Sequence, residues 1–115
     1  MQMTIGGLNF DLTSAILEHV KRRLDESVGY YAPRVRAVTV RLSDVNGPRG
    51  GEDKRCSLEV SAEQVGALRV EEIDRDLYRA VDRAAARLRR MLAKEYGRQQ
   101  SRRLNPRKSA SGLPT

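Results

Sequence analysis

The 115-residue chain contains no tryptophan, one phenylalanine, one cysteine and one histidine. Because Cys56 is alone, an intramolecular disulfide is excluded, and an unpaired thiol favours a reducing compartment. No apolar run approaches the roughly 18 residues that a transmembrane helix needs, and the N-terminal residues lack the pattern of a secretory signal. We therefore predict a cytoplasmic protein that makes no contact with a membrane.

The sequence also lacks the residue groupings that are typical of enzymes and metal sites. His19 has no second histidine or cysteine at metal-ligand spacing, so we interpret it as a partly exposed bystander. Glu71 and Glu72 are adjacent and would face opposite sides of a strand. Cys56 has the parity of a core residue. Because the sequence shows no catalytic set of nucleophile, base and orienting group, we predict a non-enzymatic protein without cofactor, metal or small-molecule substrate.

Positive charge is concentrated near the C-terminus. The chain has 22 basic and 15 acidic residues, a formal net charge of +7. Residues 1–74 hold 10 basic and 12 acidic residues, whereas residues 75–103 hold 10 basic and 3 acidic residues. A basic segment of this kind is typical of proteins that bind polyanions such as nucleic acid.

The periodicity of apolar residues predicts an α+β fold. Helical spacing predicts a helix over 14–28 after Thr13 and a longer one over about 75–98 after Asp74, ending near Gly97. Alternation predicts strands over 35–42, 56–62 and 68–71, after a short strand over 1–8. The order β-α-β-β-β-α predicts a two-layer sandwich, with two helices on one face of a four-stranded antiparallel sheet.

The remaining segments are predicted to be irregular. Residues 46–51 form a turn-rich sequence between two strands. We assign residues 1–100 to one folded domain and interpret residues 101–115 as a flexible basic tail, because they combine proline, glycine and serine with few apolar residues.

The second predicted helix carries two opposite stripes. Val81, Leu88 and Leu92 lie on one side, and basic residues recur every three or four positions on the other. Arginine dominates this basic stripe, and its guanidinium group suits bidentate contact with phosphate. The alternative is a solvated face that only keeps the protein soluble. Such faces mix the signs of charge more evenly, so the stripe favours binding.

Two stretches of the sequence resemble a known family, the bacterial ribosome hibernation-promoting factors, also called ribosome-associated inhibitors. The first is the opening Met-Gln-Met-Thr-Ile-Gly-Gly with Asn9 and Thr13, and the second is Asp-Leu-Tyr-Arg-Ala-Val-Asp at 76–82. The likeness covers about residues 1–100. The chain departs from the family pattern at Ser27, where leucine is usual, and at Met91 and Tyr96, where polar or basic residues are usual. It ends at Thr115, without the C-terminal dimerising domain of long members, and so resembles the short form.

The resemblance implies the same sandwich fold and a specific partner. Family members bind the ribosomal RNA of the small subunit in the channel for messenger and transfer RNA, compete with both, and block translation under stress or in stationary phase. The contact positions that it implies are Arg23, Arg87, Arg90, Lys94 and Arg98. The charge pattern adds Arg79 and Arg83 from the stripe and the outward-pointing Arg22 from the first helix. The predicted RNA-binding set is therefore Arg22, Arg23, Arg79, Arg83, Arg87, Arg90, Lys94 and Arg98.

Two other functions fit the residues. One is a general binder of structured or double-stranded RNA, which competition with transfer RNA for a single ribosomal site would distinguish. The other is a regulatory module that binds an acidic protein surface, in which case binding would survive nuclease treatment.

Overall fold

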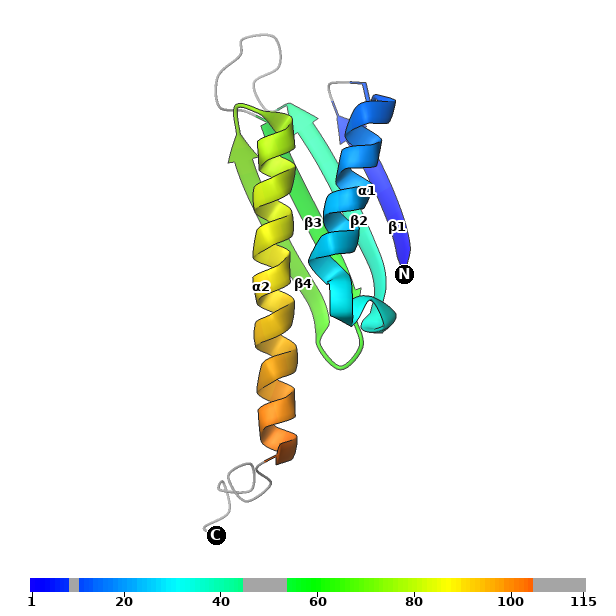
Figure 1. Ribbon diagram of the computed structural model, residues 1–115. Helices are drawn as coiled ribbons and strands as arrows, with labels where there is room; N and C mark the ends of the chain where they lie inside the picture. The colour runs from blue at the N-terminus through cyan, green and yellow to red at the C-terminus, as the bar shows by residue number, and fades with distance from the viewer. Residues whose placement is uncertain (9–10, 45–53, 105–115) are drawn as a thin grey trace.

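The fold is the predicted α+β two-layer sandwich (Figure 1). The computed structural model describes residues 1–8, 11–44 and 54–104, with the backbone alone for 100–104. The elements follow in the order β1 (Gln2–Leu8), α1 (Ser14–Val28), the 3₁₀ helix η1 (Gly29–Arg34), β2 (Val35–Asp44), β3 (Lys54–Ala62), β4 (Gly66–Asp74) and α2 (Leu77–Leu104). The loop at 46–51 and residues 105–115 of the predicted tail lie outside the described residues.

The sheet is mixed, which corrects the prediction of an antiparallel sheet. Its strand order is β1-β2-β3-β4, with β2, β3 and β4 antiparallel to their neighbours. β1 instead pairs parallel with β2, in a register that places Gln2 beside Ala37 and Leu8 beside Ser43. The physical reason is the crossover through α1, which returns the chain to the starting end of the sheet before β2 begins.

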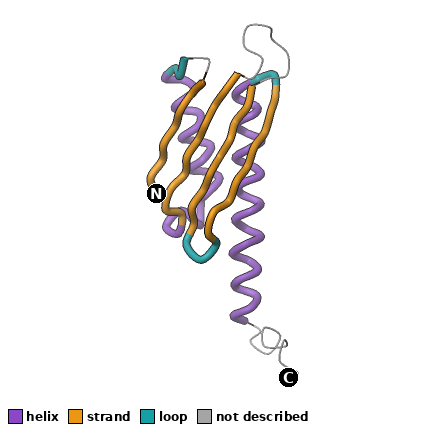
Figure 2. The backbone as a smooth tube through the Cα atoms, turned by 180° about the vertical axis from the view of Figure 1, so that it is seen from behind, coloured by secondary structure: helices purple, strands orange, loops and turns teal. Residues whose placement is uncertain are grey.

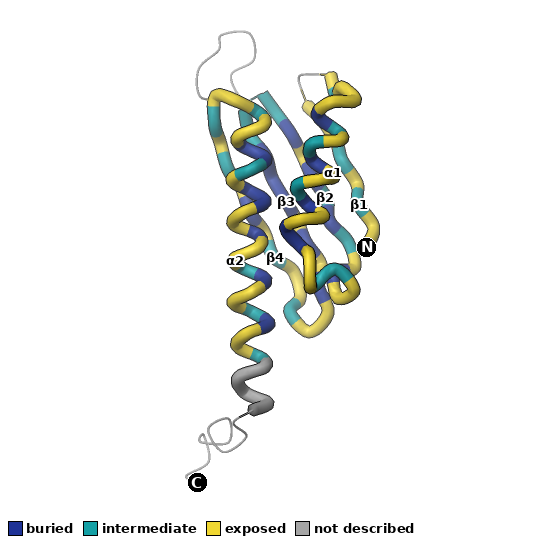
Figure 3. The backbone as a smooth tube through the Cα atoms, viewed as in Figure 1, coloured by how far each residue is buried: buried dark blue, intermediate teal, exposed yellow. Residues whose placement is uncertain are grey.

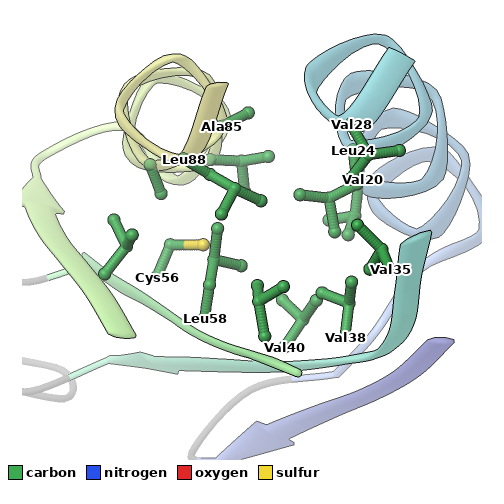
Figure 4. Packing of buried hydrophobic residues seen from close by; sticks show 14 of the residues in the cluster. Val20, Leu24, Val28, Val35, Val38, Val40, Cys56, Leu58, Ala85 and Leu88 are labelled. Carbon is green, nitrogen blue, oxygen red and sulfur yellow. The ribbon is translucent and has the colours of Figure 1, made fainter. Parts of the chain in front are cut away.

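Both helices cover one face of the sheet and leave the other face bare (Figure 2). The core between the layers is built from aliphatic side chains, as the lack of aromatic residues requires (Figure 4). Val20 and Leu24 of α1, Val40 and Leu58 of the sheet and Leu88 of α2 are all at most 1% exposed. These residues have the predicted periodicity, so the assignment of the inward faces of both helices and of β2 and β3 is confirmed.

Cys56 lies fully buried on β3, as its parity predicted. Burial, with a smaller contribution from the charge of Glu72, raises the pKa of its thiol to about 12. At neutral pH this cysteine is therefore an inert apolar core residue rather than a nucleophile.

The helix ends show where the sequence was informative. Thr13 caps α1, as predicted, by accepting a hydrogen bond of 3.2 Å from the Ile16 backbone N–H. α2 begins at Leu77, later than predicted, because Asp76 rather than Asp74 accepts the hydrogen bond of 2.9 Å from the Tyr78 backbone N–H. Gly97 does not end this helix, which continues to Leu104 and includes the first four residues assigned to the tail. One glycine costs a helix only about 1 kcal/mol.

Two kinds of structural feature do not occur in the described residues. None of the helices in the described ranges is long and apolar enough to span a membrane. Among the same residues, no cluster of three or more histidine, cysteine or acidic side chains is placed to hold a metal ion.

Candidate nucleic-acid interface

The basic stripe of α2 faces solvent along the helix. All of its members within α2 are exposed, while Val81, Leu88 and Leu92 on the opposite side are buried (Figure 3). The exposed members are Arg79, Arg83, Arg87, Arg90, Lys94 and Arg98. Their predicted orientation is confirmed, and their contact with RNA remains a prediction.

The first part of the stripe is paired with acidic residues of β4. Arg83 lies 3.2 Å from Glu72 and 3.3 Å from Asp74, and Arg87 lies 3.1 Å from Glu72. The hydrogen bond from the Asp76 backbone N–H, followed by the charges of Arg83 and Arg79, holds the pKa of Asp74 below its usual value. Asp82 and Glu95 are the acidic residues close to the stripe within α2, whereas Glu72 and Asp74 reach α2 through the fold rather than through sequence proximity.

The later part of the stripe is open. Arg90 and Lys94 are exposed and form no ion pair with any side chain in the described part of the chain. Arg98 has only a distant contact of 3.8 Å with Glu95, one helical turn before it. Arg90 and Lys94 can therefore meet phosphate groups without first losing an ion-pair partner among the described residues, and Arg98 loses only this distant contact.

The first helix contributes Arg23, which points toward α2. Its Nε lies 2.9 Å from Asp82 Oδ1, and its Nη1 lies 3.3 Å from Glu26. Arg22 points outward and is exposed, as predicted, with its guanidinium 3.5 Å from His19 Nδ1. The structure thus places Arg23 beside the basic residues of α2, whereas Arg22 contacts His19 of its own helix.

His19 is not a bystander, which corrects its interpretation. Its side chain is 12% exposed, and its Nε2 lies 2.7 Å from Asp82 Oδ1. Its ring also meets the ring of Tyr78 edge-on, with centroids 4.8 Å apart. Asp82 therefore joins His19 and Arg23 of α1 to α2, and this contact could not be read from residues that are 63 positions apart.

The same contacts explain the motif at 76–82. Asp76 caps α2 and Tyr78 packs on His19. Ala80 and Val81 are buried in the core, and Asp82 binds α1. The motif therefore fixes where the second helix begins and how it docks on the first.

An open groove of about 360 Å³ runs between the two helices. Its floor is made of small side chains, among them Ser27, whose hydroxyl donates a hydrogen bond of 2.6 Å to the Ala85 carbonyl. Arg23, Arg89 and Arg90 line it together with the acidic Glu26 and Asp82. Arg89 was not among the predicted site residues, although its position four residues after Ala85 places it on the side of α2 that faces α1. The groove joins the cations of the two helices into one surface.

The chain matches a family model described as sigma 54 modulation protein / S30EA ribosomal protein over residues 3–100. The chain belongs to this family. It is 28% identical over 96 residues to the chloroplastic ribosome-binding factor PSRP1 of Spinacia oleracea and 33% identical over 96 residues to the ribosome hibernation promotion factor of Bacillus subtilis. Each alignment covers 82% of this chain but only 32% and 48% of those relatives, so the chain spans between a third and a half of their length.

Solved structures share the fold. The N-terminal domain of Thermus thermophilus Protein Y has a TM-score of 0.69 and 30% identity, and the match covers 82% of this chain and 98% of that domain. A ribosomal subunit interface protein from Coxiella burnetii has a TM-score of 0.74, covering 84% of this chain and 99% of that protein. Its 15% identity supports the fold alone.

Proposed function

We propose that this family member binds the small ribosomal subunit, occupies the channel for messenger and transfer RNA, and thereby inhibits translation. The observation that carries the proposal is the run of unpaired, exposed cations at Arg90 and Lys94 beside the arginine-lined groove between α1 and α2. Two relatives are named as a ribosome-binding factor and a ribosome hibernation promotion factor, which supports ribosomal RNA as the ligand of this surface.

The mechanism is occlusion and requires no chemical step. Side chains that contact phosphate position a protein on RNA without reading its sequence, so recognition depends on shape and charge. The cations of α2 from Arg79 to Arg98 follow the helix over about 28 Å, which is long enough to follow an RNA backbone over several nucleotides. A domain seated in this way excludes other RNA from the same space.

Co-sedimentation with purified small subunits tests the proposal, with and without transfer RNA and at two salt concentrations. We expect saturable binding of one protein per subunit that transfer RNA displaces. If about six phosphates are neutralised, affinity falls by roughly three orders of magnitude between about 50 and 200 mM salt. Binding that transfer RNA leaves unchanged would contradict occlusion of the channel, and displacement by any duplex RNA would indicate a general binder of structured RNA.

A further inference from the structure

Three of the four tyrosines of the chain gather at one end of the molecule. Tyr31 of η1 stacks on Tyr96 of α2, with ring centroids 4.9 Å apart and planes inclined by 16°. Tyr30 meets Tyr31 edge-on at 5.3 Å. This cluster brings together η1 and the middle of α2, which lie far apart in the sequence.

The inner part of this cluster is rigidly held. Tyr96 is 4% exposed, and its hydroxyl donates a hydrogen bond of 2.8 Å to the Glu63 carbonyl in the turn between β3 and β4. The Glu63 backbone N–H in turn donates a hydrogen bond of 2.8 Å to the Arg34 carbonyl at the end of η1. Pro33 inside η1 fixes one backbone angle.

The outer member of the cluster is almost fully exposed. Tyr30 is 91% exposed, whereas the other large apolar residues with substantial exposure among those described lie between 39% and 64%. A tyrosine that contributes to the core has a buried ring, so packing in the core does not explain a tyrosine at position 30. With 91% of its surface exposed, the ring is accessible to a flat ligand.

The surroundings of this ring favour nucleic acid over an apolar partner. Arg34 lies with its guanidinium carbon 5.0 Å from the centre of the Tyr96 ring, and Arg36 is exposed two residues after the end of η1. The acidic residues of this region are Glu63 in the turn after β3 and, in the last turn of α1, Asp25 and Glu26. An exposed aromatic ring with adjacent arginines is the combination that binds unpaired bases, because the ring stacks on the base while the cations attract the phosphates.

We infer that Tyr30, supported by Tyr31 and Tyr96 and with Arg34 in the same cluster, is a stacking site for an unpaired RNA base. This site is distinct from the basic stripe of α2 and goes beyond the proposed inhibition of the small subunit. It confers a preference for RNA that carries a single-stranded or bulged nucleotide. Stacking on one ring is tolerant of base identity, so the site selects for an unpaired base rather than for a sequence.

The test uses the full chain and a single-stranded RNA of about ten nucleotides with a central 2-aminopurine, whose fluorescence is quenched when it stacks. We expect Tyr30→Ala to abolish the quenching and to weaken binding roughly 5- to 100-fold, while Tyr30→Phe preserves both. Leu8→Ala is the matched control, because Leu8 is also exposed, at 64%, and its strand pairing places it at the other end of β2. Thermal unfolding verifies that each variant is folded.

Duplex RNA separates this site from the stripe. Arg90→Glu with Lys94→Glu is expected to weaken the binding of single-stranded and duplex RNA alike, whereas Tyr30→Ala weakens only the former. If Tyr30→Ala binds and quenches the single strand as the wild type does, or weakens the duplex equally, the stacking site is refuted. The result of this test does not depend on whether the protein binds the small subunit. Either proposal can therefore fail without the other.

Discussion

Arg87 on α2 donates a hydrogen bond of 3.1 Å to the carboxylate of Glu72 on β4. This contact ties the basic stripe to the edge strand of the sheet and reduces the charge that the stripe presents. A pair that is half exposed contributes at most about 1 kcal/mol to stability, so its main effect is on what the arginine can bind. The stripe therefore has a paired part and an open part, and the two parts respond differently to substitution.

The open part of the stripe is expected to dominate binding to the small subunit. Arg90→Glu with Lys94→Glu should lower affinity by at least roughly 100-fold without lowering the midpoint of thermal unfolding, since neither side chain has an ion-pair partner among the described residues. Co-sedimentation measures the affinity. The control is Lys21→Glu with Arg69→Glu, the same change of formal charge at two exposed cations outside the stripe and the groove. An equal loss in the control would assign binding to net charge rather than to the stripe.

Removing the carboxylate of Glu72 is expected to strengthen RNA binding. Glu72→Gln releases Arg87 and, in part, Arg83, which keeps its contact with Asp74, so affinity at low salt should rise and its dependence on salt should become steeper by about one phosphate contact. Glu71→Gln is the control, because this neighbour changes the charge equally but points to the opposite face of the sheet. Identical salt slopes for the two variants would contradict the release of the arginines.

The buried thiol of Cys56 predicts a loss of stability at high pH. Its pKa in the folded protein, about 12, is higher than the ordinary value of 9.0, so folding favours the neutral thiol. This contribution is complete below pH 9, and it decreases as pH rises from 9 toward 12 because the unfolded chain ionises first. Urea unfolding between these limits should show a steeper fall in the free energy of unfolding for the wild type than for Cys56→Ala. Parallel curves would show that the thiol makes no such contribution.

Ser27 is expected to control how closely the helices approach each other. Ser27→Ala leaves the Ala85 carbonyl without its 2.6 Å hydrogen bond from the hydroxyl and should cost about 1 kcal/mol. Ser27→Leu, the residue usual in the family, adds volume against Ala85 and should cost about 1–3 kcal/mol while filling part of the groove. Thermal unfolding measures both costs. A more stable leucine variant would show that the groove is an unfilled space and not a tightly packed contact.

The sequence was most informative where a pattern reports on one local element. Alternation at Val38, Val40 and Leu42 identified β2, and helical spacing at Ile16, Val20 and Leu24 identified α1, because each pattern reflects the side facing a single core. The parallel pairing of β1 was missed, although a helix between two neighbouring strands is typical of a crossover between parallel strands. The start of α2 was misplaced because Asp74 and Asp76 are both suitable caps, and only the backbone geometry chooses between them.

The candidate site was predictable in its charges but not in their partners. The spacing from Arg79 to Arg98 placed these cations on one exposed face, because a helix converts spacing directly into direction. Which of them are paired depends on Glu72 and Asp74, whose side chains meet α2 only after β4 joins the sheet. The tyrosine cluster was equally hidden, because η1 and the turn after β3 come together only in the folded chain.

The two helices start at the same end of the sheet and run in the same direction (Figure 1). Their peptide dipoles therefore add, with the positive ends beside the acidic Asp74 and Asp76 and the negative ends toward the basic residues from Arg90 to Arg98. The side-chain charges thus oppose the backbone dipoles, while the ion pairs of Arg83 and Arg87 leave the less balanced positive charge of α2 toward Arg90, Lys94 and Arg98. The electric field of a polyanion orients such a molecule before contact. We therefore expect salt to slow the association of the protein with RNA, rather than the charges to slow its dissociation.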